Sequence, residues 1–304
     1  LNAGQLPAPY ATKGFGGLEI QPVIIDEAGG ATKQVQELRN LIQREQVDAV
    51  VGYTQRFRRR FLVVKERIQT GQIGDITAAV TRAFMNRMAP TGEVRLTQDR
   101  RFLTPMVVSG THSLDMCLWL MGNGAKPVSV YARSTEKVMS ELGTKDATFG
   151  VFTMADGIIW SMNICWALPK EWPGAVYGLE IGIVGTKGVI DIEDTHRDVI
   201  LATEMPQGPA YNPDGLKIDV ERNVDFLTSF PPGDTHRGEL WGPMREETNT
   251  WFQRIYNKKD TPHATAAEGH RNLMLTMAMD LSAKTGREIE LPLDPADLMK
   301  GLEA

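Results

Sequence analysis

Between residues 75 and 194 the hydrophobic pattern is that of β-strands joined by tight turns. Short runs rich in β-branched and aromatic residues cover residues 75–84, 128–134, 147–154 and 157–166. The last two runs flank Asp156-Gly157, a dipeptide typical of β-hairpins, and a second pair of runs flanks the sequence GTKG. The pattern predicts a mainly antiparallel sheet of six or more strands over residues 75–291.

Helical periodicity is confined to separate segments that precede, interrupt and follow the strands. The pattern predicts helices over residues 57–70, 109–121, 243–257 and 267–285. In the last of these, Leu273, Met277 and Leu281 are expected to face inward. A polar loop is expected after residue 84, and a long irregular loop over residues 203–240. Together these patterns indicate an α+β domain, an open-faced sheet with helices on one face.

The first part of the chain has a different pattern. An apolar strand is predicted at residues 18–26, a helix that begins near Thr32, and a second strand at residues 47–53. Strand, helix and strand joined by short turns form a Rossmann-like unit with two parallel strands. We therefore expect a truncated α/β segment at residues 1–52 and the larger domain at residues 53–304.

Composition excludes several classes of protein. The chain has 304 residues, of which 42% are hydrophobic, and a formal net charge of −5. A negative balance argues against a dedicated nucleic-acid binder, whose phosphate contacts need a basic excess. Cys117 and Cys165 both lie in apolar runs and are interpreted as core thiols. The sequence contains no apolar run near the roughly 18 residues that cross a bilayer, and its start lacks the pattern of a signal peptide. A cytoplasmic setting is expected.

The segment GTHSLDMCLWLMG contains the strongest candidate for chemistry. His112 and Asp115 are three residues apart at the start of a predicted helix, so they share a face. A histidine that titrates near neutrality beside a carboxylate is suited to act as a general base, with the acid orienting the ring. The alternative is that His112 caps the helix or packs against it.

Other polar residues give weaker signals. Residues 53–70 contain six basic side chains and one acidic side chain, and an early arginine such as Arg56 either faces solvent or contacts an anionic cofactor or substrate. His263 and His270 are expected at the surface, not as metal ligands. No group of cysteine, histidine and carboxylate residues has the spacing of a metal site, so no metal is expected.

From about residue 51 to residue 292 the sequence resembles the Gfo/Idh/MocA oxidoreductases. The resemblance rests on VGYTQRFRRRFLVVKERIQTGQIGDI, GTHSLDMCLWLMG, GTKGVIDIE and AAEGHRNLMLTMAMDLSAKTGREIELP, in this order. It implies a sugar, inositol or related polyol as substrate and hydride transfer to or from NAD or NADP. It further implies that His112 takes the proton of a substrate hydroxyl, and that the open sheet face mediates formation of a homo-oligomer.

Two positions depart from the family pattern. Many members have an aspartate four residues before the histidine, where this chain has Val108. If VIIDEAGG is aligned with the family's Glu-Lys-Pro motif, Glu27 takes the place of the lysine that stabilises the alkoxide, close to the cofactor. Residues 1–52 resemble instead the first lobe of periplasmic binding proteins of the branched-chain amino-acid type, which indicates a chimera.

The leading hypothesis is therefore an NAD(P)-dependent dehydrogenase with an incomplete dinucleotide site. The alternative is a non-catalytic sugar-binding or oligomerising module that has lost this site. A solute-binding protein is a third possibility, which rests on residues 1–52 alone. Binding of NADH or NADPH would distinguish the first two hypotheses.

Overall fold

The computed structural model describes most of the chain after residue 50. The described residues are 51–97, 100–122, 124–173, 176–194, 199–207, 222–227 and 233–304. The chain divides into two compact units, Leu1–Ala49 and Val50–Ala304. The predicted strand and helix between residues 18 and 46 lie outside the described residues, as does Glu27.

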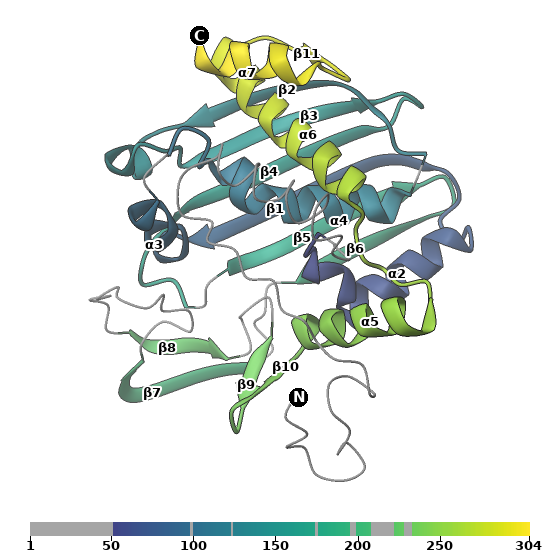
Figure 1. Cartoon of the computed structure of the whole chain (residues 1–304). Coiled ribbons are helices and arrows are strands. Elements are labelled where there is room, and N and C mark those ends of the chain that lie inside the picture. Colours follow the sequence, from purple (N-terminus) through teal and green to yellow (C-terminus); the bar gives the residue numbers. More distant parts are fainter. Residues whose placement is uncertain are drawn as a thin grey trace. The chain divides into compact units, whose positions relative to one another are not determined.

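The second unit is built on a seven-stranded sheet with the order β11-β2-β3-β4-β1-β5-β6 (Figure 1). Its strands are β1 (Ile76–Asn86), β2 (Pro127–Thr135), β3 (Ala147–Met154), β4 (Ile159–Leu168), β5 (Val176–Gly185), β6 (Gly188–Asp194) and β11 (Ile289–Glu290). The pair β1 and β4 is parallel, and every other neighbouring pair is antiparallel. The prediction of a mainly antiparallel sheet of six or more strands is confirmed.

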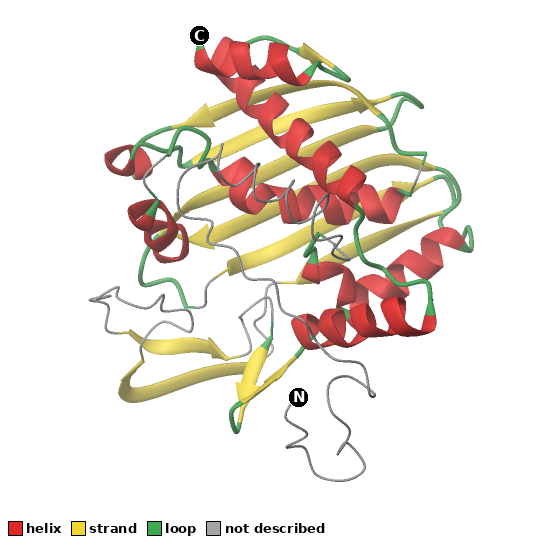
Figure 2. Cartoon of the chain, viewed as in Figure 1, coloured by secondary structure: helices red, strands yellow, loops and turns green. Residues whose placement is uncertain are grey.

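Two long helices lie on the same face of this sheet (Figure 2). Helix α4 (Thr111–Met121) packs against β1, and α6 (Ala266–Thr285) crosses β2 and β3 and contacts α4. The remaining helices are η1 (Thr54–Phe57), α2 (Arg59–Gln69), α3 (Met88–Leu96), η2 (Met106–Gly110), η3 (Met139–Leu142), α5 (Pro243–Asn257) and α7 (Pro295–Glu303). None of the helices in the described ranges is long and apolar enough to cross a membrane.

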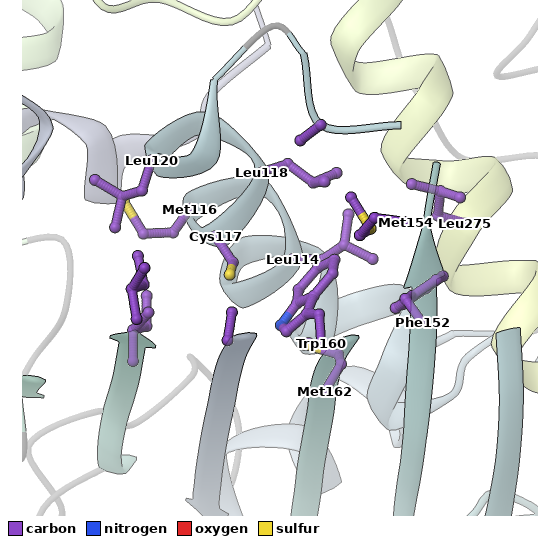
Figure 3. Close-up of a cluster of buried hydrophobic side chains, with 14 of the residues drawn as sticks. Leu114, Met116, Cys117, Leu118, Leu120, Phe152, Met154, Trp160, Met162 and Leu275 are labelled. Carbon is purple, nitrogen blue, oxygen red and sulfur yellow. The ribbon is translucent and has the colours of Figure 1, made fainter. Parts of the chain in front are cut away.

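The core lies between the sheet and α4, and it follows from the alternation of side chains along each strand. Alternate residues of β4, among them Trp160 and Met162, are fully buried beneath the apolar side of α4 (Figure 3). The Trp160 ring stacks on Phe152 of β3 with ring centroids 5.0 Å apart, and its Nε1 donates a 2.8 Å hydrogen bond to the Thr81 hydroxyl of β1. Three adjacent strands are therefore joined through one side chain.

The opposite set of strand residues is apolar but exposed. The large hydrophobic side chains on this open face are Val80, Tyr131, Phe149, Val151, Ile159, Val184 and its cross-strand partner Val189. Phe149 stacks on Phe84 with ring centroids 6.1 Å apart, and the Arg82–Glu180 ion pair joins β1 to β5. Within the described residues the predicted arrangement, with helices on one face of the sheet, is thus present, and the other face is rich in exposed apolar surface.

Two short hairpins follow the sheet where a long irregular loop was expected. Strand β7 (Val199–Gln207) pairs with β8 (Arg222–Leu227), and β9 (Asp234–His236) pairs with β10 (Glu239–Trp241). The prediction of an irregular loop over residues 203–240 is therefore wrong for these four strands. Proline and glycine are frequent in the whole stretch, and they obscured the short β-branched runs between them.

Two further expectations are corrected. The polar loop expected after residue 84 contains α3, whose start is fixed by the Asn86 side chain, an acceptor for the Met88 backbone N–H at 3.0 Å. Within α6, Met277 and Leu281 are buried as predicted, whereas Leu273 is 44% exposed. Leu273 lies near the N-terminal end of α6, where Asn272 and Leu275 take the inward positions.

Candidate functional site

His112 lies in the first turn of α4, directly after the single π-helical turn η2. Its side chain is exposed, yet the protein packed closely around it lowers the pKa of the imidazole by desolvation. The ring meets that of Tyr53 edge to face, with centroids 5.9 Å apart and an interplanar angle of 87°. Since a lowered pKa favours the neutral imidazole at neutral pH, the ring is able to accept a proton.

Asp115 has different surroundings from His112, although the two residues share the first turns of α4. Its carboxylate is buried and accepts two hydrogen bonds from Arg56, at 2.7 Å from Nε and at 2.6 Å from Nη2. The Asn272 amide donates a third at 2.8 Å. Among the described residues Asp115 makes no hydrogen bond with His112, so its hydrogen bonds join α4 to η1 and α6.

The Arg56 guanidinium is the centre of a buried network. Besides Asp115 it contacts Glu268, at 3.1 Å from Nη2 to Oε1, and the Pro262 carbonyl oxygen at 3.3 Å. Arg56 is 2% exposed. Burial raises the pKa of Asp115, although Arg56 and Asn272 both favour its charged form. Because Nε, Nη1 and Nη2 all have protein partners, this arginine joins three segments of the chain.

Further residues beside Arg56 belong to this network. The sequence pattern does not identify them as site residues. The Tyr53 and Thr111 hydroxyls are 2.8 Å apart, and burial raises the pKa of Tyr53. Glu268 also belongs to the capping box at the start of α6, in which its side chain accepts from the Thr265 backbone N–H at 2.8 Å. The spacing Thr-x-x-Glu is a local signal for such a cap, whereas nothing local indicates that Asn272 reaches α4.

A cavity of about 470 Å³ adjoins Arg56, at the C-terminal end of α4. Its polar walls include Lys65, Glu268 and Arg271. Lys65 Nζ donates to the backbone carbonyls of Trp119 and Leu120, and burial lowers the pKa of this lysine. A cation at this position is favourable because the last carbonyls of a helix carry partial negative charge.

The remaining predicted residues lie elsewhere. His263 is buried, which corrects the expected surface position, and its ring contacts Phe57 and Trp251 with centroid distances of 4.6 and 5.6 Å. His270 is exposed. Cys117 is buried, which raises the pKa of its thiol to about 12. In the described part of the chain, no group of three or more histidine, cysteine or carboxylate side chains is arranged to bind a metal ion.

The surroundings of Val108 suit an apolar side chain at the position where many Gfo/Idh/MocA proteins have an aspartate. Val108 lies in η2 and packs against an apolar cluster around Trp166. The Trp166 indole is fixed nearby by a 2.9 Å hydrogen bond from Nε1 to the Ser109 hydroxyl. A carboxylate at this half-buried position would therefore lie partly against apolar side chains and lose part of its hydration.

Comparison with known protein families identifies a domain in the part of the chain that forms most of the sheet. Residues 61–191 match a family model described as the GFO/IDH/MocA C-terminal domain. None of the curated proteins matches the sequence. The predicted resemblance of residues 1–52 to a periplasmic binding protein, and with it the chimera, receives no support from these matches, and residues 1–50 lie outside the described part.

Solved structures share the fold at low sequence identity. A probable dehydrogenase from Thermotoga maritima is 21% identical with a TM-score of 0.60, over 86% of this chain and 70% of that chain. The myo-inositol 2-dehydrogenase from Lactobacillus plantarum is 16% identical with a TM-score of 0.60, over 86% and 70%. The scyllo-inositol dehydrogenase from Lactobacillus casei, solved with NAD(H) and scyllo-inositol, is 16% identical with a TM-score of 0.58, over the same shares. At these identities the likeness establishes the fold.

Proposed function

We propose that this chain is an NAD(P)-dependent oxidoreductase that acts on a sugar, inositol or related polyol. The observation that carries the proposal is the exposed imidazole of His112, kept neutral by its surroundings, in a domain that matches the GFO/IDH/MocA model. Proteins of the same fold include inositol dehydrogenases, one of them solved with NAD(H) and scyllo-inositol. These relatives support the class of substrate and the cofactor.

In the proposed reaction His112 is the general base. Its neutral imidazole accepts the proton of a substrate hydroxyl, and the exposure of the ring allows a small polyol to reach it. A nicotinamide, if bound, would supply the acceptor for the hydride of the carbon that carries this hydroxyl. Asp115 contributes by holding α4 against Arg56 and Asn272, and so fixes the helix from which His112 projects.

The described residues fit the proton-accepting half of this chemistry. They contain no glycine-rich turn between a parallel strand and a helix, which is the usual site for the phosphates of a dinucleotide. Arg56, a candidate contact for an anionic cofactor, has carboxylate and carbonyl partners within the protein. The described residues therefore support the proton transfer to His112 and supply no site for dinucleotide phosphates.

Titration of the full chain with NADH and NADPH, followed by fluorescence, tests the proposal together with turnover of myo-inositol, scyllo-inositol and a panel of sugars. We expect binding of one nucleotide and turnover of a polyol. His112→Ala should lower turnover by about 10²–10⁴-fold, the usual contribution of a general base. The matched control is His270→Ala, an exposed histidine on α6, which should leave turnover unchanged. Equal turnover in His112→Ala and the parent chain would refute the role of His112.

Glu27 provides a second arm of the same experiment. By resemblance it takes the place of a lysine that stabilises the alkoxide, so Glu27→Lys should raise turnover or nucleotide affinity by removing a repulsive charge. Unchanged turnover and nucleotide affinity in Glu27→Lys would contradict the placement of Glu27 in the site.

The second candidate function is a non-catalytic sugar-binding or oligomerising module. The exposed apolar side chains of the open sheet face favour it, because a face of this kind is usually covered by a partner. A second copy of the chain, joined through this face, is the partner that we propose under both functions. Absence of nucleotide binding, combined with a stable oligomer, would favour the module over the enzyme.

A further inference from the structure

Tyr53 lies between the buried ion pair and His112. On one side the guanidinium carbon of Arg56 is 5.9 Å from the centroid of the Tyr53 ring. On the other side the ring of His112 meets it edge to face at 5.9 Å. The tyrosine is 6% exposed, whereas His112 is exposed. A rigid, buried ring thus supports a ring that solvent reaches.

The Tyr53 side chain is fixed from several directions. Its hydroxyl is 2.8 Å from the Thr111 hydroxyl, one residue before His112 in the chain. Its backbone carbonyl accepts a 3.0 Å hydrogen bond from the Arg56 backbone N–H, which begins η1. The Asn272 amide, which binds Asp115, also interacts with the Tyr53 hydroxyl. Tyr53 is therefore coupled to α4, η1 and α6 at once.

His112 has few such restraints of its own. Within the described ranges, Tyr53 is the one aromatic or hydrogen-bonding partner of the His112 ring. The χ2 torsion of a histidine has a broad energy minimum, so an imidazole takes a defined orientation only where neighbours restrain it. An edge-to-face contact with an immobile ring is a restraint of this kind, because such pairs favour one relative orientation by the electrostatics of the two rings.

We propose that Tyr53 is a positioning residue that holds the imidazole plane of His112 through the edge-to-face contact and the hydroxyl tether to Thr111. The consequence for catalysis rests on the proposed function, since an oriented imidazole matters there for receiving a proton. The restraint itself is a property of the folded chain. Among the described residues, the charged groups that act on Tyr53 are Arg56 and Asp115, and Arg56 also binds Glu268.

Histidine NMR of the full chain tests this restraint without any need for activity. The chain has five histidines, and the His112 imidazole resonance is identified by its loss in His112→Ala. In Tyr53→Leu we expect that resonance to lose its ring-current shift. We also expect its midpoint to move upward towards the ordinary pKa of histidine, because removing the ring lessens the desolvation of His112.

Two further variants distinguish the effect of the Tyr53 ring from that of its hydroxyl and from the effect of losing any tyrosine. Tyr53→Phe keeps the ring and loses the tether, so the His112 resonance should broaden or shift partway towards that of Tyr53→Leu. Tyr256→Leu, at an exposed tyrosine on α5, should leave His112 unchanged. The buried His263, between Phe57 and Trp251, reports on the fold in every variant.

The outcomes decide the proposal whether or not the chain is an enzyme. An unchanged His112 resonance and midpoint in Tyr53→Leu, with His263 also unchanged, would overturn it. If Tyr53→Leu does not fold, Tyr53→Phe decides instead. An unchanged His112 resonance in that variant would overturn the proposal, because the hydroxyl tether to Thr111 is part of it. Where turnover is present, Tyr53→Phe should lower kcat on the order of 10-fold and leave KM unchanged, as expected for a misplaced catalytic group. A parent chain without turnover contradicts the proposed function and leaves the NMR test intact.

Discussion

Asp115 and His112 illustrate how two residues of one helical turn acquire different roles from their surroundings. The Asp115 carboxylate is buried with three hydrogen bonds, whereas the His112 imidazole is exposed and contacts one ring. Burying a carboxylate and a guanidinium together is tolerated because each compensates the other. It follows that Asp115 contributes first to stability, and to chemistry through the position of α4.

Replacing Asp115 by asparagine tests this role. Asp115→Asn keeps the shape of the side chain but leaves the Arg56 charge with Glu268 as its remaining carboxylate partner. We expect a loss of about 3–5 kcal/mol in the free energy of unfolding, measured by urea denaturation. Glu303→Gln breaks the exposed Arg101–Glu303 pair instead, and should cost less than about 1 kcal/mol. Similar losses in both variants would contradict the importance of the buried pair.

His263 leads to a prediction about acid stability. The ring hydrogen-bonds the Thr261 hydroxyl and the Glu247 carbonyl oxygen, and burial lowers its pKa. Above about pH 6.5 the folded and unfolded states both hold this residue neutral, and its stabilising contribution is fully present. As pH falls below that value the unfolded state takes up the proton first, so stability is lost until the lower pKa of folded His263 is reached.

The measurement is the pH dependence of the urea midpoint between pH 7.5 and 5. We expect the parent chain to lose stability more steeply on the acid side than His263→Gln, which lacks the titrating ring. His270→Gln, at an exposed position seven residues further along the chain, should follow the parent curve. If the urea midpoints of the parent chain and His263→Gln change in parallel with pH, His263 has the same pKa in the folded and unfolded states, and the prediction is wrong.

The residues of the site differ in how far the sequence could predict them. His112 stands out because a histidine at a helix start beside a carboxylate is a local pattern. The partners of Asp115 are not local, since Arg56 precedes it by 59 positions and Asn272 follows it by 157. Only the packing of η1 and α6 against α4 brings them together, and a single sequence carries no record of that packing.

At the scale of elements, the hairpins were predictable because their signals are short-range. The Asp156-Gly157 turn joins β3 to β4 as expected, with a positive φ of 86° at Gly157. The four short strands after β6 were missed, because proline and glycine mask runs of three to nine residues. The predicted inward face of α6 is wrong at Leu273, because the helix is buried on several sides along residues 275–282 and Leu273 lies outside that stretch.

The crossing of α6 over the sheet depends on a glycine in β3. A Cβ at Gly150 would lie 2.9 Å from the Tyr131 carbonyl oxygen and 2.6 Å from the Met279 Cε of α6. Gly150→Ala should therefore lower the free energy of unfolding by about 1–3 kcal/mol, the usual cost of overpacking, as measured by urea denaturation. Gly182→Ala is the matched control in β5, where the added Cβ meets nothing closer than 3.8 Å. A larger loss in the control would contradict this account of the crossing.

At the scale of the whole molecule, the described sheet has one covered face and one bare face. Helices α4 and α6 bury the first, and the second presents seven large hydrophobic side chains to solvent, among them Phe149 and Val151. Apolar surface of this kind is stabilised by removal from water. We therefore expect two copies of the chain to associate through this face.

Sedimentation velocity or light scattering of the full chain checks this expectation. Phe149→Asp should convert the oligomer to a smaller species, because it places a charge within the apolar face. Val63→Asp is the matched control, since Val63 on α2 is exposed to the same 46% as Phe149 and lies off the sheet. An unchanged mass in Phe149→Asp, or a monomeric parent chain, would refute association through the open face.

The position of β1 inside the sheet, between two strands that follow it in the sequence, has a consequence for biosynthesis. Its two neighbours in the sheet, β4 and β5, begin 73 and 90 residues after β1 ends at Asn86. At about 5–20 residues per second, a ribosome needs roughly 4–15 s to add the first of these partners. During that interval β1 has both edges unpaired, the condition under which strands associate with other chains. Until β4 and β5 have been translated, this interior strand of the nascent chain is therefore exposed to pairing with other chains.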